Sequence, residues 1–195
     1  MKAPLIYIGG TLKTARLTLE PLQPDHADPM FEGFADPRIY TWIDVPPPAS
    51  VDDLRDRFAR IAQPYAPTGE LWLNWPMRVN DADAYAGLVE ATMRPDRVVY
   101  LAYFVFTRFS RQGMAKEACT TVIDHLFRAY DAVEVRAEMD YRNIPSRCLV
   151  ESLGFKRRTH NKPTTLRGRP ALDYRYRLKR PVLEPVHSRS WPSGE

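Results

Sequence analysis

The sequence predicts an α/β (α+β) fold, with one mixed, mostly antiparallel sheet of about six to seven strands flanked by helices. Three strand-like runs, 71–79, 85–93 and 98–106, are separated by short polar turns, as in an antiparallel meander. The clearest helical period follows, from Arg111 to Tyr130, with apolar residues at i, i+3 and i+4 steps. An alternating run at 132–139 comes next. The strand–helix–strand order therefore predicts that 98–106 and 132–139 are parallel neighbours.

The other elements follow from local signals. The alternation at 15–22 predicts a half-buried strand, and the helical spacing within 24–36 predicts a short helix. Ser50 caps a predicted helix over 50–63, and residues 143–155 start on an asparagine and stop at Gly154, as a short helix does. Residues 155–160 and 171–180 form a predicted final strand pair joined by a basic loop. The run 98–106 is apolar on both faces, so we expect it to be central and covered on both sides.

Length and composition indicate an ordinary globular protein. The 195 residues suit a single domain, which we place at 1–180, and the tail 181–195 is rich in proline and serine and is expected to be poorly ordered. A net charge of +4 permits an anionic ligand without requiring nucleic acid. Cys119 and Cys148 fall on apolar faces of helical patterns, and we predict free thiols in a reducing cytoplasm. No apolar run is long enough for a membrane helix and the start does not read as a signal peptide, so we expect a cytoplasmic protein without a membrane partner.

The stretch SRQGMAKEA, residues 110–118, follows the most apolar strand and opens the clearest helix. The first amides of a helix lack intrahelical partners and carry partial positive charge, which together favour an anion. Gly113 lets an anion approach the backbone, and Arg111 and Lys116 add charge nearby. These features predict a pyrophosphate site, with an ordinary helix start as an equal alternative on spacing alone. Neither G-x-x-x-x-G-K-[ST] nor G-x-G-x-x-G is present, which argues against the familiar nucleotide loops.

The chain resembles the GCN5-related N-acetyltransferase (GNAT) superfamily, most closely its branch of ribosomal-protein N-terminal acetyltransferases. That pattern runs G-x-(G/A)-x-E-A, then N-x-x-S, then L-G-F, and the likeness covers roughly Ala15 to Lys179. This sequence matches it at Gly113, Ala115, Glu117, Ala118, Asn143, Ser146, Leu153, Gly154 and Phe155.

The resemblance implies a GNAT fold, with a splayed parallel strand pair that binds acetyl-CoA as donor. It implies that Asn143 contacts the pantetheine arm, that Ser146 lies at the cofactor and that Ser146 protonates the departing thiolate. Three positions depart from the family: Ser110 opens the loop, Val150 stands where many relatives carry a tyrosine, and Tyr100 stands where many carry a glutamate. The backbone that would hold the cofactor is Phe104, Val105 and Phe106 for pantetheine and Arg111, Gln112, Gly113, Met114, Ala115 and Lys116 for pyrophosphate.

Acyl transfer to an amine also needs a base, oxyanion donors and an acceptor cleft. Backbone amides at the end of strand 98–106 are the predicted oxyanion donors. Glu90 is the first candidate base because its apolar strand neighbours would raise its pKa, although a solvated strand-face glutamate is an equal alternative. Glu138, Asp140 and Asp173 are the runners-up. We expect the acceptor at loop 40–48, with Tyr40 and Trp42 as aromatic walls and Asp44 as an acid that attracts an amine.

The resemblance, together with these candidate residues, implies an acetyl-CoA-dependent N-acetyltransferase. The acceptor is a primary amine, either a protein N-terminus or a small amine, and it attacks directly in a ternary complex. The alternative is a catalytically silent acyl-CoA sensor of the same fold. Nucleic-acid binding through the basic C-terminal hairpin is a weaker hypothesis, because aromatic residues are interleaved only at DYRYR. We predict no metal site, and the sequence leaves a homodimer open.

Overall fold

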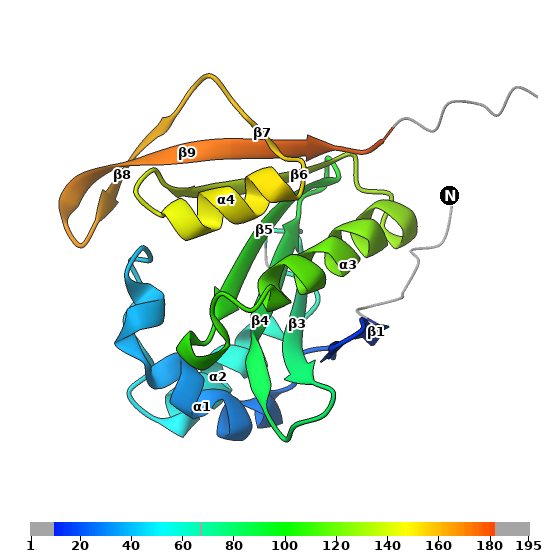
Figure 1. Cartoon of the computed structure of the whole chain (residues 1–195), viewed down its shortest axis with the longest axis vertical. Helices are drawn as coiled ribbons and strands as arrows, with labels where there is room; N and C mark the ends of the chain where they lie inside the picture. The colour runs from blue at the N-terminus through cyan, green and yellow to red at the C-terminus, as the bar shows by residue number, and fades with distance from the viewer. Residues whose placement is uncertain (1–9, 67, 182–195) are drawn as a thin grey trace, which may run out of the picture.

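A computed structural model describes residues 10–66 and 68–181, so the predicted disordered tail lies almost entirely outside the described residues. The described residues form one mixed sheet in the order β1-β2-β3-β4-β5-β6-β9-β7, with β8 paired to β9 (Figure 1). The sheet has more strands than predicted because β1 is an unpredicted two-residue strand and β8 lies inside the predicted basic loop, while β7 falls within the predicted strand 155–160 and pairs with β9. The strands are β1 (Leu12–Lys13), β2 (Leu17–Leu19), β3 (Leu71–Val79), β4 (Tyr85–Met93), β5 (Val98–Val105), β6 (Glu134–Asp140), β7 (Lys156–Arg157), β8 (Lys162–Leu166) and β9 (Arg169–Lys179).

Four α-helices and three short 3-10 helices accompany this sheet in the described part of the chain. Ser50 caps α2 as predicted, since its side chain accepts from the amide of Asp53. The structure begins α3 later than the predicted Arg111, because Gly113 has the left-handed φ of 79° and acts as its N-cap. The helices are η1 (Pro24–His26), α1 (Ala27–Ala35), η2 (Pro37–Tyr40), α2 (Val51–Ile61), η3 (Thr107–Phe109), α3 (Met114–Ala129) and α4 (Ile144–Ser152).

The parallel pair predicted from the crossover is confirmed. β5 pairs with β6 in parallel from Val98↔Glu134 to Tyr100↔Arg136, and the other strand pairs are antiparallel. Beyond Tyr100 and Arg136 no pairing joins β5 to β6, although both strands continue. The sheet therefore splits between its two central parallel strands.

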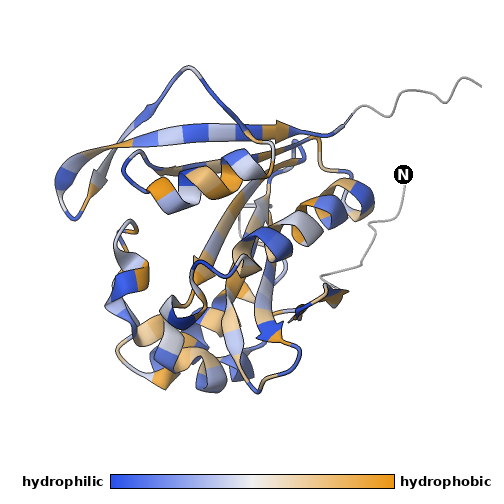
Figure 2. Cartoon of the chain, viewed as in Figure 1, coloured by the Kyte–Doolittle hydropathy of each residue, from blue (hydrophilic) through white to orange (hydrophobic). Residues whose placement is uncertain are grey.

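Two hydrophobic cores cover the two faces of the sheet. The larger core joins β2–β6 and β9 to α3 and α4, and the smaller joins β4 and β5 to α1, α2 and η2. Figure 2 shows apolar colouring along β5 and hydrophilic colouring along most of the β8–β9 hairpin. We refer below to the α3/α4 face and the α1/α2 face of the sheet.

The expectation that residues 98–106 are covered on both sides needs one correction. Val99 and Leu101 are buried toward α3, and Phe104 is buried in the smaller core, but Ala102 is exposed. The reason is that α1 and α2 cover only part of their face. They meet β5 near Phe106, whose ring lies so close to α1 that a Cβ on Gly33 would approach it to 2.4 Å.

Two local predictions also change. The predicted strand 15–22 forms the regular strand β2 only at Leu17–Leu19, although the amides of Glu20 and Leu22 still donate to the backbone of β3. Cys119 is buried and Cys148 is exposed, so the prediction of an apolar helix face is wrong for Cys148, while both thiols are free as predicted. In the described ranges, no helix combines the length and the apolar character needed to span a membrane.

Candidate active site

The predicted phosphate loop forms an exposed turn at the start of α3. Arg111 and Gly113 both have left-handed φ angles, 65° and 79°, so the chain reverses sharply before Met114. Residues 111–113 are exposed, and the first amides of α3 have no intrahelical acceptor. The arrangement suits an anion, because free N–H groups and the positive end of the helix dipole meet where Gly113 presents no Cβ.

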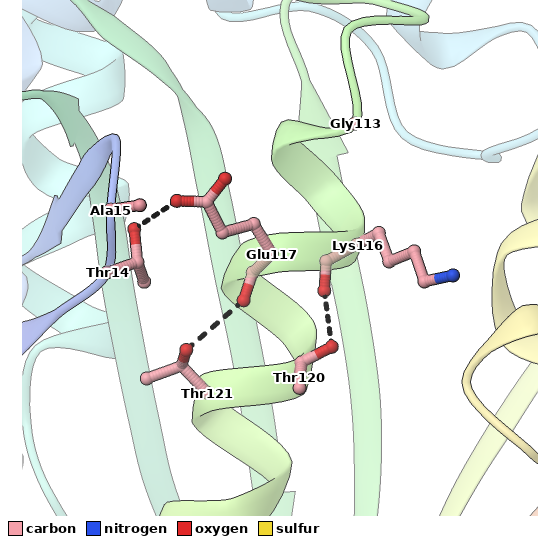
Figure 3. A pocket seen from close by; sticks show the side chains of 7 residues that line it. All are labelled: Thr14, Ala15, Gly113, Lys116, Glu117, Thr120 and Thr121. Atoms are coloured by element: carbon pink, nitrogen blue, oxygen red, sulfur yellow. Dashed lines mark hydrogen bonds between the residues drawn. The ribbon is translucent and has the colours of Figure 1, made fainter.

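Two residues that the sequence did not single out hold this turn. The Arg16 guanidinium donates to the backbone oxygen of Gln112 at 2.9 Å and to Glu117 Oε2 at 2.7 Å. The Arg16 amide and the Thr14 hydroxyl both donate to Glu117 Oε1, at 2.8 and 2.5 Å. Burial raises the pKa of Glu117, but these donors outweigh it and hold the pKa below its usual value. The glutamate of the G-x-(G/A)-x-E-A pattern therefore fastens the β1–β2 turn to α3 (Figure 3).

A surface pocket of about 480 Å³ lies between that turn and α3. Thr14 and Ala15 line one side, and Gly113, Glu117 and Thr120 line the other. The Lys116 side chain extends away from Thr14 and Ala15 (Figure 3). Its charge is therefore directed to the opposite side of the helix from the Glu117 carboxylate, where an anion would not meet that acid.

At the end of β5, backbone N–H and C=O groups face the split in the sheet. The Phe106 amide already donates to the Ala86 oxygen at 2.9 Å, so Phe106 faces β4. Because opposed residues in an antiparallel ladder alternate between bonded and non-bonded pairs, Phe104 also faces β4 and Val105 faces away from it. Of the three predicted pantetheine contacts, Val105 is the one whose N–H and C=O point into the split.

Asn143 and Ser146 lie at the start of α4. Asn143 is the N-cap, and its Oδ1 accepts from the Ser146 amide at 3.2 Å, which leaves the Asn143 NH₂ group to donate elsewhere. The Ser146 Oγ lies 2.6 Å from the hydroxyl of Tyr103 on β5. Val150, the position where relatives often carry a tyrosine, is fully buried in the larger core. Tyr103 was missed in the sequence because it lies in the continuous apolar run 98–106, which predicted only a central strand.

Glu90 lies on the α1/α2 face of the sheet. Its register partner in β5 is Ala102, the exposed residue of that strand. Its carboxylate meets the Arg57 guanidinium of α2 at 3.3 Å, and that guanidinium also lies over the rings of Phe34 and Phe104. Burial raises the pKa of Glu90, and the nearby Arg57 only partly offsets this. A carboxyl group with a raised pKa is suited to accept a proton near neutral pH.

The runner-up carboxylates share that face, because alternate residues of β6 and β9 point the same way. Asp140 is buried and forms a two-point ion pair with Arg142, whose hydrogen bonds lower its pKa. Glu138 pairs with Lys162 and Arg175, and these partners lower its pKa despite burial. Asp173 lies opposite Asp140 in the ladder, and burial raises its pKa. Asp173 thus differs from the other two, since no ion pair with a described residue holds it.

The predicted acceptor loop meets the tip of the β8–β9 hairpin. The Arg167 backbone amide donates to Asp44 Oδ1 at 3.2 Å, and its guanidinium donates to the backbone oxygen of Tyr40 at 3.1 Å. The ring of Trp42 lies under the Arg142 guanidinium, 5.4 Å from its centroid. Tyr40 needs a correction: it is 2% exposed in the smaller core, so it supports the loop from inside and forms no cleft wall.

The structure thus divides the predicted residues between two faces of a split sheet. Ser146 and Asn143 lie on the α3/α4 side, with the loop of Gly113 at the head of α3. Glu90, Asp140 and Asp173 lie on the α1/α2 face. This arrangement can hold a thioester donor along the split and admit an acceptor from the opposite face. Such a site defines an acyltransferase.

A comparison with known protein families identifies the family of this chain. The acetyltransferase (GNAT) domain matches residues 16–156, from Arg16, which contacts Glu117, to the start of β7. The chain belongs to this GNAT acetyltransferase family, and its donor is acetyl-CoA.

Relatives and solved structures support the same fold. An uncharacterized N-acetyltransferase p20 of Bacillus licheniformis is 25% identical over an alignment of 154 residues, and the match covers 75% of this chain and 83% of that protein. RimL, a ribosomal L7/L12 alpha-N-protein acetyltransferase in complex with coenzyme A, superposes with a TM-score of 0.77 at 14% identity, over 87% of this chain and 98% of that one. The ribosomal-protein-S5-alanine acetyltransferase of Vibrio fischeri gives 0.76 at 14% identity, over 90% and 100%.

Proposed function

We propose that this protein transfers the acetyl group of acetyl-CoA to a primary amine, either a protein N-terminus or a small amine, by direct attack in a ternary complex. The observation that carries the proposal is the split between β5 and β6, which has the Val105 backbone at its edge. The candidate proton donor Ser146 lies on one side of this split, and the candidate base Glu90 lies on the other face of the sheet. RimL and the Vibrio fischeri protein carry the names of N-terminal and ribosomal-protein acetyltransferases, which supports a protein N-terminus as one acceptor class.

Each group in the site has a defined task. Acetyl-CoA supplies the thioester when bound, and the amides at Arg111 to Lys116 together with the Asn143 NH₂ group would hold it. The Val105 amide points into the split and would donate to the oxygen on which charge develops. Glu90 would take the amine proton through water, because its raised pKa leaves it a usable base. Ser146 would give its proton to the departing sulfur.

The acceptor would enter from the α1/α2 face. Ala102 is exposed between Glu90 and the carboxylates of β6 and β9, so a small side chain leaves room beside the candidate base. The contact of Arg167 with Asp44 joins the acceptor loop to the β8–β9 hairpin and would close one end of this surface. Holding both reactants in this way supplies much of the acceleration through proximity.

The test is a thiol-release assay with acetyl-CoA against a panel of N-terminal peptides and small amines. Release of free CoA with at least one amine, and detection of the acetylated amine by mass spectrometry, is the expected result. Binding of CoA by calorimetry without turnover across the panel would favour the silent sensor. Absence of CoA binding would refute both functions.

A further inference from the structure

Tyr103 brings a phenol to the hydroxyl of Ser146 from a different element. Its oxygen lies 2.6 Å from Ser146 Oγ and 3.3 Å from the Ser146 backbone oxygen. The first distance is at the short end of the range for O–H···O hydrogen bonds, so it is the dominant contact. No second hydrogen-bond partner of Ser146 Oγ exists in the part of the chain that the structure describes.

The location of Tyr103 makes this contact more than local packing. Tyr103 lies on β5 beyond Tyr100, the last residue that pairs with β6, and its side chain packs on the α3/α4 face. The next residue, Phe104, directs its backbone N–H and C=O to β4, whereas Tyr103 and Val105 direct theirs to the split. The Tyr103–Ser146 contact therefore bridges from the open edge of β5 to the first turn of α4.

One proton lies between the two oxygens, and its donor can be identified. A phenol is a stronger acid than an aliphatic alcohol, so the phenol is the better donor to a neutral hydroxyl. Burial raises the pKa of Tyr103, so its hydroxyl stays protonated at neutral pH. A serine oxygen that accepts from Tyr103 keeps its own proton for another acceptor.

We infer that Tyr103 is a positioning residue for Ser146: its hydroxyl donates to Ser146 Oγ and directs the serine proton into the split, where the thiol leaves. This inference rests on the proposed function. When the C–S bond breaks, sulfur takes the serine proton and Ser146 Oγ is reprotonated through water in the same step, so no free alkoxide forms, while the hydrogen bond from Tyr103 holds the serine oxygen in place. The replacement proton is the one that the amine has given to Glu90, so the products are the amide and free thiol.

The experiment is a double-mutant cycle with Tyr103→Phe and Ser146→Ala. Tyr103→Phe should lower kcat about tenfold, while the KM for acetyl-CoA and the Kd for CoA stay within twofold. In the Ser146→Ala background, Tyr103→Phe should change kcat less than twofold, because its partner is gone. Equal losses in the two backgrounds, or a weakened Kd with kcat unchanged, would overturn the inference.

Tyr176→Phe is the matched control. Tyr176 is buried on the same face, and its hydroxyl donates to Glu151 of α4 at 2.8 Å, so the variant removes a comparable phenol bond without touching Ser146. Its kcat should stay within twofold of the parent protein. A loss equal to that of Tyr103→Phe would assign both effects to packing and overturn the inference.

A second readout separates this inference from the proposed function. If the parent protein acetylates no amine, the proposed function fails, but the same cycle can be measured by denaturant unfolding. A coupling between Tyr103→Phe and Ser146→Ala in the free energy of unfolding supports the hydrogen bond. Additive effects on unfolding would overturn the inference whether or not the protein is active.

Discussion

Replacing Gly113 with alanine tests the phosphate site directly. Gly113 has φ +79°, and an L-residue in the left-handed region costs roughly 1–2 kcal/mol. The added Cβ would meet Arg16 Nη2 at 3.5 Å, an ordinary van der Waals distance, so the fold has room for it. We therefore expect Gly113→Ala to lower the free energy of unfolding by about 1–2 kcal/mol and to leave the protein folded.

The effect on CoA binding should be larger than this backbone cost implies. If the turn relaxes away from φ +79°, the phosphate loses at least one N–H bond, and a hydrogen bond to a charged group is worth about 1.5–3 kcal/mol. That loss corresponds to a Kd about 10- to 150-fold weaker. Isothermal titration calorimetry with CoA measures the Kd, and denaturant unfolding measures the stability.

Gly69 provides the matched control for this substitution. Its φ is +81°, and a Cβ there would meet nothing within 4 Å, so Gly69→Ala carries the same backbone cost far from the loop. Gly69→Ala should lose similar stability and keep the parent Kd for CoA. An unchanged Kd in Gly113→Ala, or equal weakening in both variants, would refute the assignment of this turn to phosphate.

Three further predictions follow from the site and its surroundings. Arg16→Ala should weaken CoA binding about tenfold in calorimetry, because the hydrogen bond from the Arg16 guanidinium to the Gln112 oxygen is lost; a Kd within twofold of the parent would contradict a role of Arg16 in holding the loop. Glu90→Gln should lower the rate at least about 100-fold and remove the acid limb of the pH profile of kcat/KM. Asp173→Asn should keep that limb. Loss of the limb in Asp173→Asn alone would identify Asp173 as the base in place of Glu90. His125→Phe should abolish a loss of stability below about pH 6.5, measured by unfolding across pH.

The sign of the His125 effect follows from its burial. Burial lowers the pKa of His125 below its usual 6.5, and its Nε2 has no hydrogen-bond partner among the described residues. As the pH falls through 6.5 toward the lowered value, the unfolded chain binds a proton that the folded chain does not, so the stability decreases. A parent protein whose stability is constant from pH 7 to 5 would contradict this account.

Local signals in the sequence determined the elements themselves. The bounds of β3 and β4, the Ser50 cap and the start of α4 at Asn143 were predicted closely, because alternation, capping and turn residues act over a few neighbours. The parallel pairing of β5 with β6 was also predictable, because a strand–helix–strand crossover leaves little choice of direction. Gly113 was identified by its place between an apolar strand and a helix.

Only the tertiary structure decided which side chains meet. Arg16 contacts Glu117 from 101 residues away, Tyr103 reaches Ser146 from 43 away, and Arg57 covers Glu90 from 33 away. Tyr40, predicted as a cleft wall, lies in the core, and β8 lies inside a segment that was predicted only as a basic loop. Periodicity specifies the face of an element on which a residue lies. The partner across that face depends on strand register and helix packing, which are settled when the whole core forms.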